Sequence, residues 1–129
     1  MTDELRYEIQ DKVGLITFNR PARMNTITTD MLAALSERLL EADADPRVRV
    51  IVVTGAGRAW CAGLDLGAAA AGTGIGGDTT NIGRGELDLR TAPPVVLHKI
   101  DTPTIAALNG GAAGYGMDLA LGCDLRIAA

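Results

Sequence analysis

The chain has 129 residues, enough for one domain with its own core, and its 47% hydrophobic and 22% charged content is that of a soluble globular protein. The formal net charge of -4 argues against nucleic acid or a membrane surface as a partner, and no apolar run approaches the ~20 residues of a membrane span. Two cysteines and one histidine form no disulfide framework and no metal-ligand spacing. We therefore expect no metal and a reducing, cytoplasmic location.

The first elements along the chain are two short strands and a helix. Strand patterns at 5–10 and 13–19 are separated by a two-residue break, which favours a hairpin. A helix follows, capped by Thr28 or Thr29, and its apolar residues recur at helical spacing until the chain reaches Pro46.

The middle of the chain continues this alternation. Residues 48–54, VRVIVVT, are rich in β-branched side chains, which predicts a strand buried on both faces. Strand, helix and strand in this order are typical of an α/β fold. Residues 67–85 are mostly small, which predicts a long mobile loop, and a second helix is expected over roughly 86–100, interrupted by Pro93 and Pro94.

The last elements are a short strand at 104–108 and a helix after Gly114. Residues 124–129 have the pattern of the start of a buried strand, with no turn or polar tail after them. Because a chain seldom ends in a core strand, this pattern predicts that the sequence is a fragment of a longer protein.

Two glycine-rich turns are the candidate functional segments. In 57–66, GRAWCAGLDL, Gly63 permits a sharp turn that directs the N–H of Leu64 into a pocket. In 109–118, NGGAAGYGMD, a glycine turn opens a helix and leaves its first N–H groups unpaired. Alone, the first segment is better explained as a plain strand-to-helix turn, and the second can also be a helix that needs glycine for close packing. Together they offer two N–H donors to one oxygen, as an acyl-transfer or enolate-forming enzyme requires.

Five side chains, some within these segments and some elsewhere in the chain, are further candidates with structural alternatives. Asp118, in the first turn of its helix, is either a solvated carboxylate or a base that moves a proton. Arg23 is either a loop charge or a phosphate contact, and Asp65 either caps a helix or belongs to the site. Cys61 is predicted to be buried and unreactive, and His98 to be a surface helix residue.

Three blocks resemble the enoyl-CoA hydratase/isomerase family, also called the crotonase superfamily: NRPARMNTIT at 19–28, VIVVTGAGRAWCAGLDL at 50–66 and PTIAALNGGAAGYGMDLALGCDLRIAA at 103–129. They have the family's order and spacing. The resemblance implies the repeated β-β-α spiral of the family, with 1–129 as the N-terminal part of one domain and the C-terminal part absent. It also implies a homotrimer or a dimer of trimers.

The resemblance further implies an acyl-CoA thioester as substrate, with coenzyme A as part of that substrate and no permanently bound cofactor. The backbone N–H groups of Leu64 and Tyr115 would form the oxyanion hole that stabilises an enolate, and Arg23 would approach the phosphates. The residues implied to contact the acyl-CoA are Arg23, Ala62, Gly63, Leu64, Asp65 and Gly114.

Several departures from the family pattern leave the reaction open. Tyr115 stands where hydratases commonly have glycine, although a backbone donor does not depend on its side chain. Asp118 stands where hydratases have a glutamate that reaches roughly 1.5 Å further, whereas dienoyl-CoA isomerases have an aspartate in a similar setting. The second catalytic carboxylate of hydratases lies beyond Ala129. The leading hypothesis is enoyl-CoA hydration; the alternatives are dienoyl-CoA or Δ3,Δ2-enoyl-CoA isomerisation and a non-catalytic acyl-CoA-binding fragment.

Overall fold

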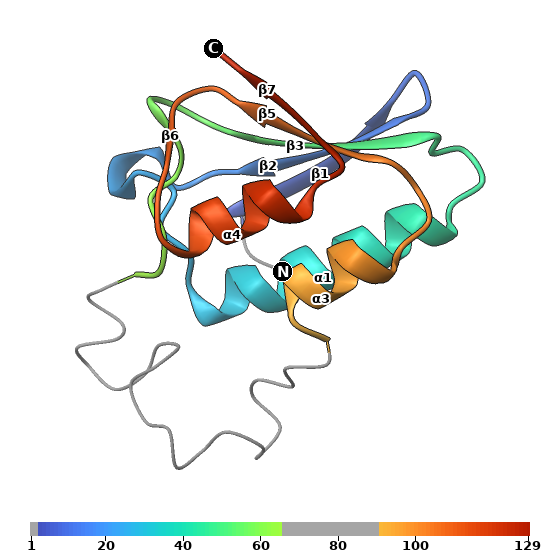
Figure 1. Ribbon diagram of the computed structural model, residues 1–129, viewed down its shortest axis with the longest axis horizontal. Helices are drawn as coiled ribbons and strands as arrows, with labels where there is room; N and C mark the ends of the chain where they lie inside the picture. Colours follow the sequence, from blue (N-terminus) through green and yellow to red (C-terminus); the bar gives the residue numbers. More distant parts are fainter. Residues whose placement is uncertain (1–2, 66–90) are drawn as a thin grey trace.

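The computed structural model describes residues 3–65 and 91–129, and the loop predicted at 67–85 lies outside these ranges. The described chain forms a five-stranded sheet with helices on one of its faces, which confirms the α/β class (Figure 1). The strands are β1 (Leu5–Gln10), β2 (Val13–Phe18), β3 (Val50–Gly55), β5 (Thr104–Leu108) and β7 (Leu125–Ala128), in that spatial order. The helices are the 3₁₀-helix η1 (Pro21–Arg23), α1 (Thr29–Ala44), α3 (Pro93–Lys99) and α4 (Tyr115–Gly122).

The predicted hairpin and first helix are confirmed. β1 and β2 pair in antiparallel fashion, and Asp11 and Lys12 between them have positive φ angles of 46° and 70°, as a tight hairpin turn requires. The Thr28 hydroxyl caps α1 by accepting a hydrogen bond from the Met31 N–H at 3.2 Å. The remaining neighbours in the sheet, β2-β3, β3-β5 and β5-β7, are parallel.

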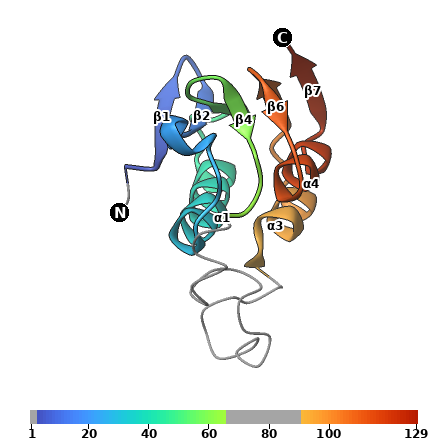
Figure 2. The same ribbon diagram turned by 90° about the vertical axis from the view of Figure 1, so that its left-hand side faces the viewer.

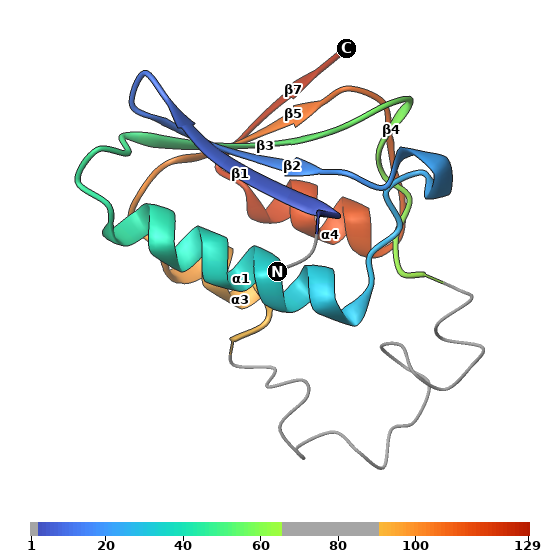
Figure 3. The same ribbon diagram turned by 180° about the vertical axis from the view of Figure 1, so that it is seen from behind.

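The prediction that β3 is buried on both faces is wrong. Ile51 and Val53 are buried, whereas Val50 and Val52 are only partly buried. The physical reason is that the three described α-helices, α1, α3 and α4, pack on the same face of the sheet (Figure 3). Val52 pairs with Ile105 on the neighbouring strand and lies on the opposite face.

The strand predicted at the end of the chain is present as β7, but the prediction that it is buried is also wrong. Leu125 is 58% exposed and Ile127 is 63% exposed. Their register partners, Ile105 and Ala107, place them on the face that no described helix covers. In addition, β7 is at the edge of the sheet and, among the described strands, pairs with β5 alone.

The second predicted helix is correct only in its last part. Residues 86–90 lie outside the described ranges, and α3 begins at Pro93 instead of being interrupted there. Pro93 and Pro94 occupy its first positions. The first N–H groups of a helix have no acceptor within the helix, so proline loses no hydrogen bond there, and its fixed φ favours the helix. No described helix is long and apolar enough to cross a membrane.

A short pair of strands, β4 (Ala59–Cys61) and β6 (Gly111–Ala112), lies beside the main sheet (Figure 2). Trp60 of β4 packs edge-on against Phe18, with ring centroids 5.2 Å apart. Its indole N–H donates to the Val53 carbonyl oxygen at 3.0 Å. These fully buried contacts fix β4 against the core, and β4 leads directly into the first glycine-rich turn.

Candidate functional site

The two glycine-rich turns begin at equivalent positions of the β4–β6 pair. The two strands are parallel, with Cys61 opposite Ala112, and the Ala113 N–H donates to the Cys61 carbonyl oxygen at 3.1 Å. Leu64 and Tyr115 each follow three positions after this pair. Because parallel strands advance together, the register brings the two predicted donors to the same end of the ladder.

The peptide N–H of Leu64 points away from Ile27, which binds the residues on either side of Leu64. The Ile27 N–H donates to the Gly63 carbonyl oxygen at 2.7 Å, and the Asp65 N–H donates to the Ile27 carbonyl oxygen at 3.0 Å. In such a bridge the central residue directs its own N–H to the opposite side. Within residues 3–65 and 91–129, the N–H groups of Leu64 and Tyr115 have no hydrogen-bond acceptor.

Both turns require glycine, and they lie close together. Gly63 has φ of +113° and Gly114 has φ of +56°, conformations that other residues rarely adopt. A Cβ atom on Gly63 would lie 3.1 Å from the Ala113 carbonyl oxygen and 3.8 Å from the Tyr115 nitrogen. A side chain at position 63 would therefore project against the second turn, beside its N–H donor.

An open pocket of about 610 Å3 adjoins these donors. This volume is within the range of small-molecule sites. All six residues that the resemblance implies for acyl-CoA contact are on its surface, together with Tyr115. The described lining residues are Arg23, Met24, Thr26, Ala62, Gly63, Leu64, Asp65, Gly114 and Tyr115.

Residues 8–129 match the family model described as Enoyl-CoA hydratase/isomerase. The chain belongs to the enoyl-CoA hydratase/isomerase family. It is 40% identical to the probable enoyl-CoA hydratase EchA14 of Mycobacterium tuberculosis, a match that covers 98% of this chain and 47% of that protein. It is 38% identical to the (E)-benzylidenesuccinyl-CoA hydratase of Thauera aromatica, over 94% of this chain and 45% of that protein.

Solved structures show the same fold. A probable enoyl-CoA hydratase/isomerase from Mycobacterium abscessus matches with a TM-score of 0.79 and 38% identity, over 98% of this chain and 46% of that chain. An enoyl-CoA hydratase subunit from Geobacillus kaustophilus matches with a TM-score of 0.84 and 33% identity, over 98% and 46% respectively. The chain thus spans about half the length of these family members.

Asp118 lies apart from the other predicted site residues. It is in the first turn of α4, exposed to solvent, and is not among the described residues that line the pocket. Its charge nevertheless reaches Tyr115, since burial and then the Asp118 carboxylate raise the pKa of the Tyr115 phenol to about 12. The phenol is therefore a neutral hydrogen-bond donor at physiological pH.

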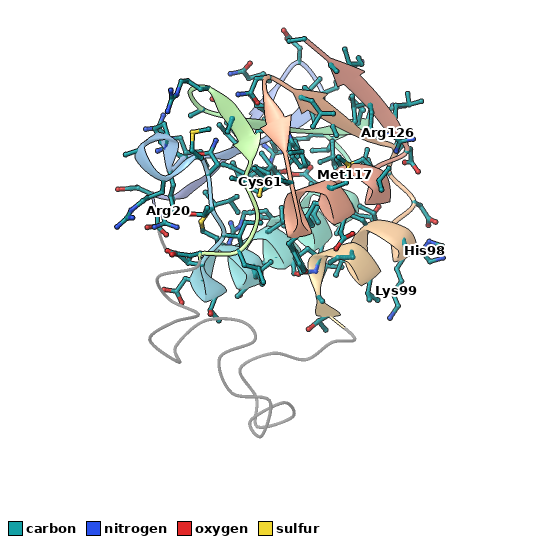
Figure 4. The ribbon with its side chains drawn as sticks, turned by 60° about the vertical axis from the view of Figure 1, so that its left-hand side comes forward. Arg20, Cys61, His98, Lys99, Met117 and Arg126 are labelled. Carbon is teal, nitrogen blue, oxygen red and sulfur yellow. The ribbon has the colours of Figure 1, made fainter. Side chains whose placement is uncertain are left out.

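Cys61 and His98 lie where the sequence predicts, the first in the core and the second on the surface. Cys61 is buried, and burial raises the pKa of its thiol to about 11 although a hydrogen bond to the Gly63 backbone opposes the shift. His98 is exposed on α3, on the opposite side of the molecule from Arg20 (Figure 4). No group of three or more metal-ligating side chains occurs in the described part of the chain.

Two asparagines that the sequence analysis did not single out support both turns. Asn25 is fully buried, and its amide N–H groups donate to the carbonyl oxygens of Ala56 and Ala59 at 2.9 and 2.8 Å. Asn109 donates to the carbonyl oxygens of Gly57 and Ala59 at 3.0 and 3.1 Å. The strand β4 is thus held by two side chains at Ala59. The sequence offers only a faint signal, an asparagine within a turn; in the structure Asn25 has φ of +55°, a conformation that asparagine tolerates.

Proposed function

We propose that this chain supplies the thioester-binding part of an enzyme that hydrates enoyl-CoA through an enolate. The proposal rests on one observation: the N–H groups of Leu64 and Tyr115 lie beside one pocket and have no acceptor among the described residues. Donors fixed in this way stabilise negative charge on a thioester oxygen without reorganising during the reaction. Loss of one such donor lowers the rate by about 10²–10³.

The pocket suits the coenzyme A part of the substrate. Arg23 is exposed on η1 and lines the pocket, so its guanidinium is available to phosphate oxygens. The turn from Ala62 to Asp65 supplies the surface along which the pantetheine would lie. Coenzyme A enters as part of the substrate, with no permanently bound cofactor. The trimeric assembly implied by the resemblance stays a prediction.

Asp118 is assigned the proton transfer. In hydration a water oxygen bonds to the β-carbon of the enoyl thioester, and the α-carbon of the resulting enolate takes up a proton. A carboxylate can accept the proton that the water loses and then deliver a proton to the α-carbon, which leaves the carboxylate ionised again. Asp118 is three residues after Tyr115, in the first turn of the same helix.

Two assays test this function. Purified protein is given crotonyl-CoA, and hydration is followed by the loss of ultraviolet absorbance of the conjugated thioester. Separately, bound acetoacetyl-CoA is titrated with base, because a site that stabilises an enolate lowers the pH at which this ligand ionises. We expect hydration and a lowered ionisation pH. Coenzyme A binding without either effect would leave only the non-catalytic binding hypothesis.

The shorter carboxylate favours isomerisation as a second candidate. Asp118→Glu extends the side chain by one methylene, and we expect it to increase hydration if Asp118 replaces the hydratase glutamate. The same purified protein is offered a 3,5-dienoyl-CoA and a Δ3-enoyl-CoA. If the unmodified protein isomerises either compound and Asp118→Glu abolishes this activity, isomerisation is the native reaction.

A further inference from the structure

Arg20, labelled in Figure 4, lies on the side of the molecule opposite His98. Its guanidinium group connects three segments of the chain. One nitrogen donates to the Thr26 carbonyl oxygen at 2.7 Å, and another donates to the Asp65 carboxylate at 3.1 Å. The third lies 3.4 Å from the Glu4 carboxylate. The side chain is only 14% exposed, so its charge is compensated mainly by these partners.

The partners of Arg20 lie on both sides of the bridge that orients Leu64. Thr26 precedes Ile27 on one segment, and Asp65 follows Leu64 on the other. The bridge itself consists of two backbone hydrogen bonds between Ile27 and the residues flanking Leu64. Arg20 therefore binds across the bridge, with one nitrogen on each of its two segments.

We propose that Arg20 is a positioning residue that fixes the direction of the Leu64 N–H and thereby the strength of the oxyanion hole. The inference rests on the proposed function. Rotation of the peptide before Leu64 would displace the neighbouring Asp65, and the charge-assisted bond to Arg20 opposes this displacement. Misplacement of a reacting group by about 1 Å lowers rates by as much as ~100-fold, so a small movement of this donor is sufficient.

The geometry requires arginine and not simply a positive charge. The planar guanidinium reaches a carbonyl oxygen and a carboxylate on different segments at the same time. A lysine ammonium in the same place is a single point donor on a flexible stem. Arg20→Lys should therefore keep the charge and lose part of the positioning, with an effect between those of the native side chain and Arg20→Met.

The experiment compares two ligands. Acetoacetyl-CoA reports on the oxyanion hole through the ionisation of its bound α-carbon, whereas coenzyme A has no thioester carbonyl and reports on the rest of the pocket. Arg47→Met is the matched control, because it removes an Arg–Asp pair of 2.8 Å near the other end of β3, where Arg47 is 73% exposed. Circular dichroism and thermal unfolding verify that each variant is folded.

We expect Arg20→Met to lower the acid ionisation constant of bound acetoacetyl-CoA by about 10- to 100-fold, because the enolate is stabilised less. The affinity for coenzyme A should change by less than about twofold. Arg20→Lys should show a smaller loss, and it provides the test if Arg20→Met does not fold. Arg47→Met should change neither property.

An unchanged ionisation constant in the folded Arg20 variants overturns the inference, as does an equal loss for both ligands. If the native protein itself does not favour the enolate, the proposed function fails, and the inference with it.

Discussion

The two turns that carry the N–H donors are held in different ways. The first, which contains Leu64, depends on the bridge to Ile27 and on the Arg20 side chain. The second, which contains Tyr115, depends on close packing of backbone atoms at the start of α4. Donors with the same proposed role are therefore sensitive to different substitutions. Side-chain changes can weaken the first by degrees, whereas the second tolerates almost no added volume at Gly116, where its backbone packs against β4.

Gly116 shows how close the backbones are in the second turn. A Cβ atom at this position would lie 2.2 Å from the Cys61 carbonyl oxygen and 3.0 Å from the Cys61 carbonyl carbon. These neighbours are backbone atoms of β4, and β4 is fixed by the buried Trp60. Neither α4 nor β4 can move away alone without disturbing the pair that sets the donor positions.

The largest effect is therefore expected for Gly116→Ala. The added methyl group should cost about 3 kcal/mol in the free energy of unfolding and should separate the two donors, with a loss of at least about 100-fold in enolate stabilisation. Urea unfolding and titration of bound acetoacetyl-CoA measure the two losses. Gly111→Ala is the matched control, because a Cβ atom there meets nothing within 4 Å. Equal behaviour of the two variants would contradict the backbone-packing argument.

Substitution of Asn25 should have the next largest effect, because this residue supports both turns through Ala59. Asn25 is fully buried, and Asn25→Ala leaves the partly buried Arg20 N–H and Ala56 carbonyl oxygen without this partner, at a cost of about 2–3 kcal/mol. Asn109→Ala removes a similar set of hydrogen bonds at a partly exposed position, where water can replace them, and should cost about 1 kcal/mol. Urea unfolding of both variants checks this order, and the reverse order would show that burial does not control the effect.

The sequence predicts the parts of the site that depend on local patterns. The hairpin, α1 with its Thr28 cap and β5 follow from periodicity and turn residues, and Gly63 has the positive φ that its turn requires. The three sequence blocks that resemble the family also occur in the order in which family members have them, which is consistent with the placement of these elements in one α/β fold.

Non-local contacts are the part that local patterns miss. The strands β4 and β6 are three and two residues long, too short to produce a periodic signal. Arg20 and Asp65 are 45 positions apart, and nothing in the residues between them indicates that they pair. The predictions that β3 and β7 are buried were also wrong, because β-branched composition does not reveal which face of the sheet the helices cover.

The smallest effect on the site is expected for Asp43, which lies on α1 and binds the segment before β5. Its carboxylate accepts hydrogen bonds from the Asp101 N–H and from the N–H and hydroxyl of Thr102, the last at 2.7 Å. Burial opposes ionisation, but these hydrogen bonds outweigh it and lower the pKa of Asp43 below its ordinary value of 3.8. This clamp is at the opposite end of β5 from the turn that contains Tyr115.

A carboxylate with a lowered pKa stabilises the folded state above its ordinary pKa and loses that contribution as the pH falls through the folded-state value. Asp43→Asn should therefore reduce the free energy of unfolding by about 1 kcal/mol at neutral pH, and the difference from the native protein should shrink below about pH 4. Urea unfolding at both pH values measures this difference, with substitution of the exposed Asp101, Asp101→Asn, as the control.

Ionisation of bound acetoacetyl-CoA should not change in Asp43→Asn, because this clamp stabilises the scaffold without setting the direction of either donor. Weaker stabilisation of the bound enolate in Asp43→Asn would show that the second turn depends on contacts along the whole of β5, and not only on its backbone packing against Cys61.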